Sequence, residues 1–362
     1  MVSTISKIKK FEKVSSPKFS LIIPVYNVED FLVQCLDSIV NQTLEDFEII
    51  CINDGSTDNS LKILNQYAAE DKRFIVISQE NQGQGIARNK GLECSRGEYI
   101  VFVDPDDWIE LNALEEIYKA FKNTKSEVIE FNYREYNDYS GKIKDISLAR
   151  KLKKVFNYDL KLIPYYNWEK FKNGCLYKLD MHVWARAYSN NFIKKAKAIF
   201  APTKHGEDHL FACSVVLNAE RIHYLDKYLY TYRCRNGSAV NKISNDNFGI
   251  FQNCELLKEY LIAHNFYDEL KEEFRRYQAQ VFIWHYRNIP DENKEKYEMM
   301  CKEILPNEEF KKMLHKAQSN NSFLEFLFSL KNERKFGIKY KVITILGIKI
   351  KLKPNKKSEG VN

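Results

Sequence analysis

The sequence predicts an α/β fold, with a mainly parallel sheet and helices on both of its faces. Between residues 19 and 133, short continuous apolar runs alternate with stretches whose apolar residues recur every three or four positions. Continuous apolar runs are typical of strands covered on both faces, and a repeated strand–helix order implies parallel strands joined by helices. Hydrophobic residues make up 44% of the 362 residues and charged residues 29%, which excludes a disordered chain.

Four short apolar runs are the predicted parallel strands. They cover residues 19–24, 47–53, 74–78 and 99–103. Each run has the length of a strand and is followed by polar or turn-forming residues. A fifth run, at 127–133, predicts one further strand.

Amphipathic helices are predicted after each of the four strands. The first has apolar residues at the spacing of one helix face: Leu32, Cys35, Leu36, Ile39 and Val40. The same spacing continues over 61–68, 86–95 and 114–121. Asn27 and Asp58 are placed to cap the first and second helices.

Beyond residue 134 the pattern becomes irregular and rich in aromatic residues. We predict five parts along the chain: a basic extension (1–18), two halves of one α/β domain (19–133 and 134–240), a C-terminal helical region (241–330) and a short basic tail (331–362). The helical region has a break near Pro290, and its amphipathic helices are also a candidate oligomer interface. In the tail, Lys alternates with Ile or Leu over 348–353, which is the period of a strand.

The net charge of +7 is unevenly distributed. Residues 331–362 carry ten Lys or Arg and two Glu, a net charge of +8, and residues 1–18 carry five Lys and one Glu, a net charge of +4. The rest of the chain therefore has a net charge of −5. A nucleic-acid-binding domain would carry positive charge on its own folded face, so we expect no nucleic-acid partner.

The cysteines and the hydropathy pattern predict a cytoplasmic location. None of the eight cysteines forms a Cys-x-x-Cys pair, which disfavours zinc ribbons and redox motifs. No apolar run approaches the roughly 18 residues that a membrane span needs. The N-terminal residues are basic but lack the apolar core of a secretory signal.

Acidic residues follow two of the predicted strands. Asp54 follows the second strand, and Asp104, Asp106 and Asp107 follow the fourth. The carboxyl ends of parallel strands share one edge of the sheet, where open α/β sheets bind ligands. Carboxylates at this density repel one another unless a cation lies among them, and Mg²⁺ is usually held by one or two carboxylates together with substrate phosphates. The pattern predicts a di- or triphosphate bound through Mg²⁺ or Mn²⁺.

Two common nucleotide-binding motifs do not fit. The segment Gly83-x-Gly85-x-x-Arg88 has Arg where a dinucleotide fingerprint has its third glycine, and it follows the third strand instead of the first. The phosphate-binding motif G-x-x-x-x-G-K-[ST] is not in the sequence.

Four segments together resemble the family 2 glycosyltransferases. They are SLIIPVYN, NDGSTDNS, NQGQGIARNKGLECSRGEYI and VFVDPDDW, in this order, within residues 19–110. The resemblance implies an inverting enzyme of the GT-A fold that uses a nucleotide-sugar donor. Within this family, the chain resembles bacterial glycosyltransferases that make surface polysaccharide or lipooligosaccharide.

The resemblance implies that residues 19–133 bind the nucleotide sugar. The implied ligands are Pro24 and Tyr26 for the uracil, Asp54 for the base, Arg88 for the diphosphate or sugar, Asp104 for the ribose or a metal-bound water, and Asp106 for the metal. Asp106 and Asp104 would hold Mn²⁺ or Mg²⁺. The alternatives are turn formation for Asp54, helix capping or turn formation for Asp104 and Asp106, and a structural salt bridge for Arg88. Asp107 is either a helix cap or a hydrogen-bond partner of its neighbours.

The second half, 134–240, is expected to bind the acceptor. Inverting transfer needs a general base for the acceptor hydroxyl. The segment HGEDHLF at 205–211 resembles the family motif Glu-Asp-x-x-Phe, in which Asp is the base. Asp208 is therefore the predicted base, and Glu207 an acceptor-binding residue. The alternative is that both acids only complement the dipole of a helix N-terminus.

Other motifs of the second half are less specific. Trp184, in VWARAY, resembles the family's Trp-x-Lys-Leu-Tyr segment and either stacks on an acceptor sugar or belongs to the core. Tyr232, Arg233 and residues 237–238 resemble a stretch that would close over the diphosphate. His205, His209 and His223 are candidate metal ligands, although surface or core histidines are commoner.

These observations predict an inverting, metal-dependent hexosyltransferase. It would move a hexose or N-acetylhexosamine from a UDP-sugar to a hydroxyl of a glycan, expected to be lipid-linked. The alternative is an inactive scaffold of the same fold that binds nucleotide sugars or glycans. The basic tail predicts peripheral contact with the cytoplasmic face of the inner membrane, the alternative being a solvated tail with a small hairpin.

Overall fold

The computed structural model describes residues 16–156, 159–172, 174–178, 182–203, 206–235, 248–318, 328–335, 338–345 and 348–352. Most of the predicted basic extension 1–18, His205 and residues 237–238 lie outside these ranges. The described chain divides into two compact units, the first ending at Tyr277 and the second beginning at Gln278.

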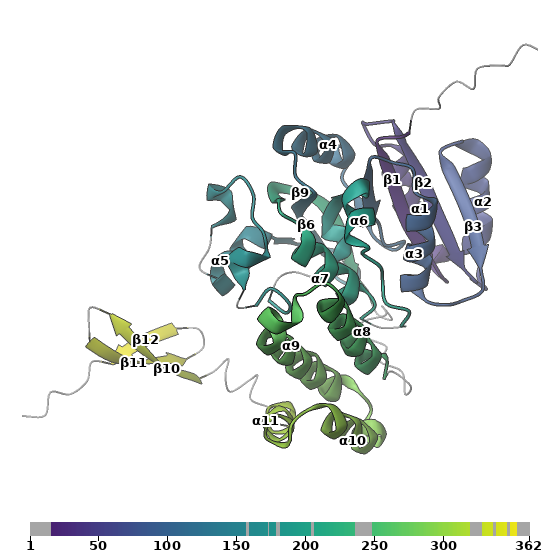
Figure 1. The fold of residues 1–362 in the computed structure, drawn as a ribbon. Helices are drawn as coiled ribbons and strands as arrows, with labels where there is room; N and C mark the ends of the chain where they lie inside the picture. Colours follow the sequence, from purple (N-terminus) through teal and green to yellow (C-terminus); the bar gives the residue numbers. More distant parts are fainter. Residues whose placement is uncertain are drawn as a thin grey trace, which may run out of the picture. The chain divides into compact units, whose positions relative to one another are not determined.

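The first unit is built around a mixed sheet with the strand order β3-β2-β1-β4-β8-β6-β9-β5, and β7 pairs with β6 (Figure 1). The four predicted parallel strands are β1 (Phe19–Val25), β2 (Phe47–Asp54), β3 (Phe74–Gln79) and β4 (Tyr99–Phe102). They pair in parallel in the order 3-2-1-4. The prediction of a mainly parallel α/β sheet is therefore confirmed.

The helices that join these strands are α1 (Glu29–Val40), α2 (Ser60–Glu70), α3 (Gln84–Cys94) and α4 (Ala113–Thr124). α3 packs on one face of the sheet, where Ala87 contacts Ile50 and Ile52. Neighbouring strand residues point to opposite faces, and Cys35 of α1 lies close to Cys51, so α1 covers the other face. A Cβ on Gly91 would lie 2.3 Å from Ile22 Cγ2, so only glycine allows α3 this close to β1.

The predicted Asn27 cap of the first helix is wrong. Asn27 has a positive φ of 49°, and its side chain accepts hydrogen bonds from the turn after β2. The backbone N–H groups of Val28 and Glu29 instead donate to Ser60 Oγ at 3.0 Å and to Asp58 Oδ2 at 3.0 Å. Residues at the start of α2 therefore cap α1. Asp58 also accepts from the Ser60 N–H at 2.9 Å, but the N-cap position of α2 is Asn59 and not the predicted Asp58.

The irregular second half completes the sheet with antiparallel and parallel strands. The first half still contributes β5 (Trp108–Ile109) and most of β6 (Val128–Asn137), which is the fifth strand predicted at 127–133. The second half contributes β7 (Lys142–Ile146), β8 (Arg186–Ser189) and β9 (Ile222–Cys234). Its helices are α5 (Leu148–Phe156), α6 (Asn190–Ala196) and α7 (Asp208–Asn218), with 3₁₀ turns η1 (Leu160–Leu162), η2 (Trp168–Phe171) and η3 (Val183–Ala185). β8 lies antiparallel between β4 and β6, which brings η3 to the carboxyl edge of the parallel strands.

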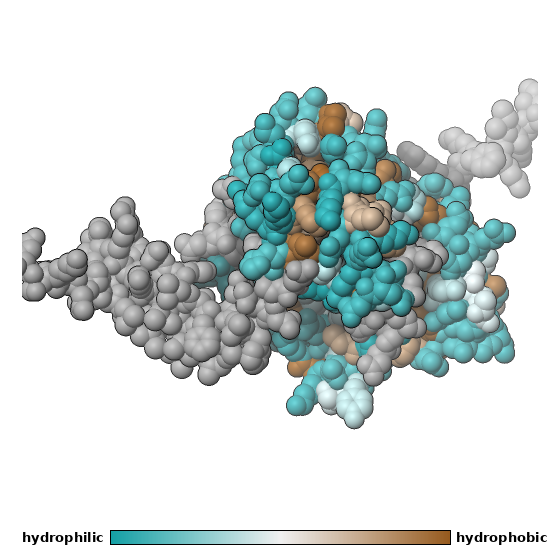
Figure 2. Space-filling model, turned by 90° about the horizontal axis from the view of Figure 1, so that it is seen from below, coloured by the Kyte–Doolittle hydropathy of each residue, from teal (hydrophilic) through white to brown (hydrophobic). Residues whose placement is uncertain are grey.

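The C-terminal region is helical, as predicted, and ends in a small sheet. Its helices are α8 (Gly249–Ala263), α9 (Tyr267–Asn288), α10 (Lys294–Ile304) and α11 (Asn307–Gln318), and the predicted break at Pro290 leads into the turn η5 (Asp291–Asn293). β10 (Phe328–Lys335), β11 (Ile338–Ile345) and β12 (Ile348–Leu352) form an antiparallel sheet. Among the described helices, none has the length and hydropathy needed to cross a membrane. The face drawn in Figure 2 is mostly hydrophilic, with scattered hydrophobic residues.

Candidate active site

The predicted acidic residues gather at the carboxyl edge of the parallel strands. Asp54 is the last residue of β2, and Asp104 follows β4 by two residues. β1 pairs with both strands in parallel, so these ends share one edge.

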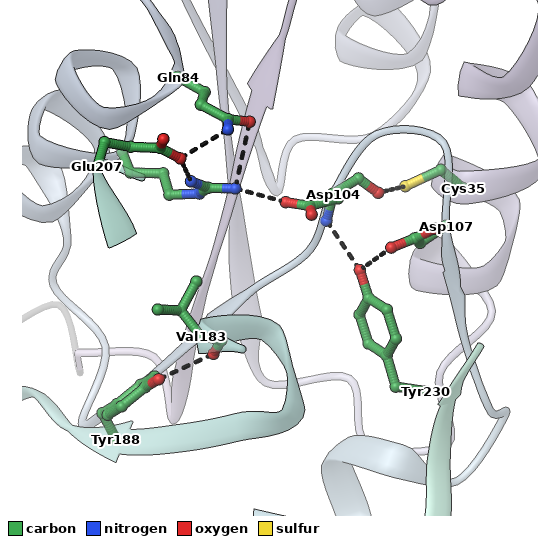
Figure 3. A network of polar contacts seen from close by, with 9 residues as sticks. Cys35, Gln84, Asp104, Asp107, Val183, Tyr188, Glu207 and Tyr230 are labelled. Carbon is green, nitrogen blue, oxygen red and sulfur yellow. Dashed lines mark hydrogen bonds and ion pairs between the residues drawn. The ribbon is translucent and has the colours of Figure 1, made fainter. Parts of the chain in front are cut away.

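Arg88 of α3 joins the two halves of this site. Figure 3 labels its partners Gln84, Asp104 and Glu207. The Arg88 guanidinium is only 3% exposed and donates to Asp104 Oδ1 at 2.7 Å and to Glu207 Oε1 at 2.9 Å. Gln84 Nε2 donates to the same Glu207 oxygen at 2.6 Å. A buried charge is tolerated when it is paired in this way. The predicted structural salt bridge of Arg88 is thus present, and its contact with the donor stays a prediction.

Glu207 is buried at the point where α7 meets α3. Burial and the neighbouring Asp208 raise the pKa of Glu207 to about 7, against the opposing effect of Arg88. A Cβ on Gly85 would lie 2.7 Å from the Ala201 carbonyl oxygen and 2.8 Å from Glu207 Cγ. The glycine therefore allows the first turn of α3 to approach the segment that carries Glu207.

Asp208 is the first residue of α7 and is half-buried. Its carboxylate accepts no hydrogen bond from any residue that the structure describes, whereas Oε1 of its neighbour Glu207 accepts two. The N-terminus of a helix stabilises the ionised form of a carboxylate. On the other side of Asp208, the His209 ring Nδ1 lies 3.0 Å from the hydroxyl of Tyr277 in α9.

The loop after β4 is held by residues at the end of β9. Asp107 is 1% exposed and accepts hydrogen bonds from the Tyr230 hydroxyl at 2.7 Å and the Arg233 N–H at 2.8 Å. Burial, with Asp104 and Asp106 nearby, raises the pKa of Asp107 well above its ordinary value. The Tyr230 hydroxyl also accepts from the Asp104 N–H at 3.0 Å. Of the two predicted roles for Asp107, hydrogen bonding is the one observed.

Asp106 is ion-paired with the residue after β9. Arg235 Nε lies 2.8 Å from Asp106 Oδ2, and about a fifth of each side chain is exposed. Burial and the charge of Asp104 raise the pKa of Asp106, against the opposing effect of Arg235.

Asp54 fixes the loop that follows β3. Its carboxylate is 2% exposed and accepts from Gln79 Nε2 at 2.8 Å and from the N–H groups of Gln82 and Gly83 at 2.9 and 2.8 Å. Tyr26 is 47% exposed at the end of β1, whereas Pro24 is buried in the strand. Their contacts with a nucleotide stay predictions.

Trp184 lies in an aromatic stack behind the acidic loop. Its ring is stacked on Tyr230 at 4.6 Å, on His182 at 4.7 Å and on Tyr232 at 5.4 Å, and Tyr133 meets it edge-on at 4.7 Å. Trp184 is only 6% exposed, as expected of a core residue. Its contact with an acceptor sugar stays a prediction.

Comparison with known proteins gives a family match for one part of the chain. Residues 20–181 match the family model described as glycosyl transferase family 2. These residues are a family 2 glycosyltransferase domain.

Relatives of the domain include glycosyltransferase GlyA of Streptococcus pneumoniae, which is 36% identical over 222 residues, covering 61% of this chain and 31% of GlyA. The poly(ribitol-phosphate) beta-glucosyltransferase of Bacillus spizizenii is 35% identical over 224 residues, covering 59% of this chain and 32% of that protein. The chain thus spans about a third of the length of these two relatives.

The fold is shared with the solved structure of Staphylococcus aureus TarS residues 1–349. The TM-score is 0.64 at 19% sequence identity, covering 93% of this chain and 99% of the TarS chain. The family match and this shared fold confirm the predicted GT-A type architecture.

In the glycosyltransferase domain, two carboxylates supply oxygen ligands of the kind that suits a divalent ion bound together with a diphosphate. Within the described residues, no three His, Cys, Asp or Glu side chains are placed to hold a metal by themselves. Asp104 and Asp106 nevertheless stand on one loop, and each is about a fifth exposed with one carboxylate oxygen in an ion pair. Two carboxylates that need substrate phosphates to complete the coordination are the usual arrangement for Mg²⁺.

Among the residues of this site that were not predicted are Tyr230, Arg235 and Tyr277. Tyr230 lies in β9, Arg235 follows β9 directly and Tyr277 lies in α9, and nothing in the local sequence indicates that these positions face the acidic loop or α7. The only signal was the Tyr232–Arg233 resemblance, which points to the same end of β9.

Proposed function

We propose that this chain transfers a hexose or N-acetylhexosamine from a UDP-sugar to a hydroxyl of a glycan, with inversion. The observation that carries the proposal is the buried bridge through Arg88, because it holds the acidic loop of the donor half against Glu207, next to the candidate base Asp208. In-line displacement requires donor-binding acids and a base that are held close to each other. The Arg88 bridge connects the two segments that carry them.

Asp208 is proposed as the general base. A half-buried carboxylate that no described side chain engages is able to accept the proton of an acceptor hydroxyl. The acceptor oxygen then attacks the anomeric carbon as the bond to UDP breaks on the opposite side. Glu207 and Arg88 hold the start of α7 in place. Glu207 is also proposed to contribute to acceptor binding, because it lies next to Asp208 in this segment.

The donor side is proposed to use the residues at the strand ends. Asp106 and Asp104 would hold Mn²⁺ or Mg²⁺, which acts as a Lewis acid on the leaving diphosphate. Tyr26 and Pro24 lie at the end of β1 beside Asp54 of β2, where the uracil is proposed to bind.

The names of related proteins support the substrate classes. One relative is named a poly(ribitol-phosphate) beta-glucosyltransferase, and the TarS structure is a complex with UDP-GlcNAc. They support a UDP-hexose or UDP-N-acetylhexosamine donor and a surface-polysaccharide acceptor. No observation favours the inactive scaffold, because the proposed metal ligand and base are both present.

A screen of donors tests the proposal. We expect UDP release above background from at least one of UDP-glucose, UDP-galactose and UDP-N-acetylglucosamine, with Mn²⁺ and a mixture of glycan acceptors. Thermal shift measured with UDP and Mn²⁺ is the accompanying binding assay. A protein that shows neither a shift nor release with any of these donors would contradict the proposed function.

We also propose that the basic tail contacts an anionic membrane surface from the cytoplasmic side. Residues 331–362 carry a net charge of +8. Each Lys or Arg near an anionic leaflet contributes about 1 kcal/mol to binding. Membrane contact of this kind would bring the enzyme to a lipid-linked acceptor.

A further inference from the structure

We infer that Arg235 is the counter-cation of Asp106 in the absence of a metal. When a metal binds, Arg235 would release the Asp106 carboxylate and pair with the donor diphosphate. The inference rests on the proposed function. Arg235 belongs to the stretch 232–238, which by resemblance would close over the diphosphate, and the inference adds its exchange of partners at Asp106. It makes Arg235 a binding residue of the donor site, because the guanidinium would contact the diphosphate.

Arg235 differs from Arg233, which stands two residues earlier at the end of β9. All three guanidinium nitrogens of Arg233 are engaged: Nε donates to the Asp106 carbonyl oxygen at 2.8 Å, Nη1 to Asp138 at 2.5 Å and Nη2 to Gln34. Arg233 is also only 7% exposed. It is therefore fixed, and its role is to hold the acidic loop.

Most N–H groups of the Arg235 guanidinium make no hydrogen bond to a described residue. Its polar contact within the described residues is the single Nε bond to Asp106, and no described residue accepts a hydrogen bond from its two terminal nitrogens. The guanidinium lies over the ring of Phe31, 4.6 Å from its centroid, with 19% of the side chain exposed. An arginine that makes one hydrogen bond and lies over an aromatic ring can exchange that hydrogen bond for another while it stays over the ring.

The charges of the loop explain why a counter-cation is present. Asp104, Asp106 and Asp107 place three carboxylates within four residues of one loop. Asp104 is balanced by the buried Arg88, and Asp106 is balanced by Arg235. A bound divalent ion would bring twice the charge of arginine and would therefore compete with Arg235 for Asp106. The released guanidinium would then be available to the diphosphate, which its planar fork of donors fits.

Two titrations of one variant test this exchange. In Arg235→Gln, we expect Mn²⁺ alone, followed by electron paramagnetic resonance of the free ion, to bind roughly tenfold more tightly than to the unaltered protein. In calorimetry at saturating Mn²⁺, we expect UDP to bind roughly tenfold more weakly. Arg235→Lys keeps the charge and should change the Mn²⁺ affinity much less.

The opposite directions of the two changes separate this role from a structural one. A merely structural arginine would weaken both ligands together, and an irrelevant one would change neither, so either result overturns the inference. Arg134→Gln is the matched control, because it removes an equally charged, ion-paired arginine from β6 and should leave both affinities unchanged. If the unaltered protein fails to bind UDP with Mn²⁺, it is the proposed function that fails; the inference fails separately when that binding is present and the opposed shifts are not.

Discussion

Asp208 and Glu207 are adjacent in the chain but have different surroundings. The Glu207 carboxylate accepts bonds from Arg88 and Gln84 in a buried position, whereas Asp208 is half-buried at the start of α7. The first is suited to hold the segment, and the second to exchange a proton with a ligand. The two acids should therefore respond differently to replacement by their amides.

Asp208→Asn should retain UDP binding and lose turnover by roughly two to four orders of magnitude, because the amide cannot accept the acceptor proton. Calorimetry with UDP and Mn²⁺ and a UDP-release assay measure the two quantities on the same sample. Near-normal turnover in this variant would remove Asp208 as the base. Asp46→Asn, at an exposed surface acid, is the control and should keep both.

Glu207 should make folding stability depend on pH. Its pKa is raised to about 7 in the folded protein, above the ordinary value of 4.5, so the folded state binds more protons between these pH values. The free energy of unfolding contributed by this group therefore falls as the pH rises from about 4.5 to 7. Thermal unfolding across this range should show a smaller decline for Glu207→Gln than for the unaltered protein. The same slope in both would contradict the assignment, and Glu70→Gln, at an exposed position of α2, should leave the slope unchanged.

At the scale of elements, the site depends on how closely α3 approaches the start of α7. Gly85→Ala would place a methyl group within 3 Å of the Ala201 carbonyl oxygen and of Glu207, so the two segments must move apart. We expect a loss of about 1–3 kcal/mol in the free energy of unfolding, together with a large loss of turnover. Denaturant unfolding and UDP release measure the two effects. Lys90→Ala, on the exposed side of the same helix, should change neither, and an unaffected Gly85→Ala protein would show that the close approach is not required.

The elements of the first half were predictable because their period is simple. Strands covered on both faces are apolar throughout, so β1 to β4 and the positions of Asp54 and Asp104 at their ends follow from the sequence. The first helix cap was not predictable in the same way, because α1 is capped by Ser60 and Asp58 of a turn thirty residues later. The local sequence predicts caps that neighbouring residues form, whereas this cap comes from a segment that is distant in the chain.

The contacts of the second half needed the structure. Tyr230 and Arg235 reach the acidic loop from more than a hundred residues away, and Tyr277 reaches His209 from a helix of the C-terminal region. Trp184 could be sugar-binding or core by sequence, because a single aromatic residue has no period that indicates burial. Its three stacked neighbours are His182, which directly precedes η3, and Tyr230 and Tyr232 of β9, a strand that the sequence does not pair with this segment.

At the scale of the whole chain, the charge is separated between an acidic body and a basic end. Deleting residues 331–362 removes a net charge of +8 from a chain whose residues 19–330 carry −5. We expect the full chain to sediment with vesicles containing anionic lipid at low salt, and the shortened chain to stay in the supernatant. Vesicles of zwitterionic lipid are the control and should retain neither. Equal sedimentation of both proteins would reject the proposed membrane contact.

The aromatic stack behind the acidic loop gives this protein a built-in optical probe. Of the four tryptophans in the chain, Trp184 lies against the Tyr230 ring, whose hydroxyl touches both Asp107 and the backbone of Asp104. A movement of that loop when a nucleotide binds should therefore shift Tyr230 and change the surroundings of the Trp184 indole. Emission from Trp184, isolated by replacing the other three tryptophans with phenylalanine, should therefore follow occupancy of the donor pocket without any attached dye.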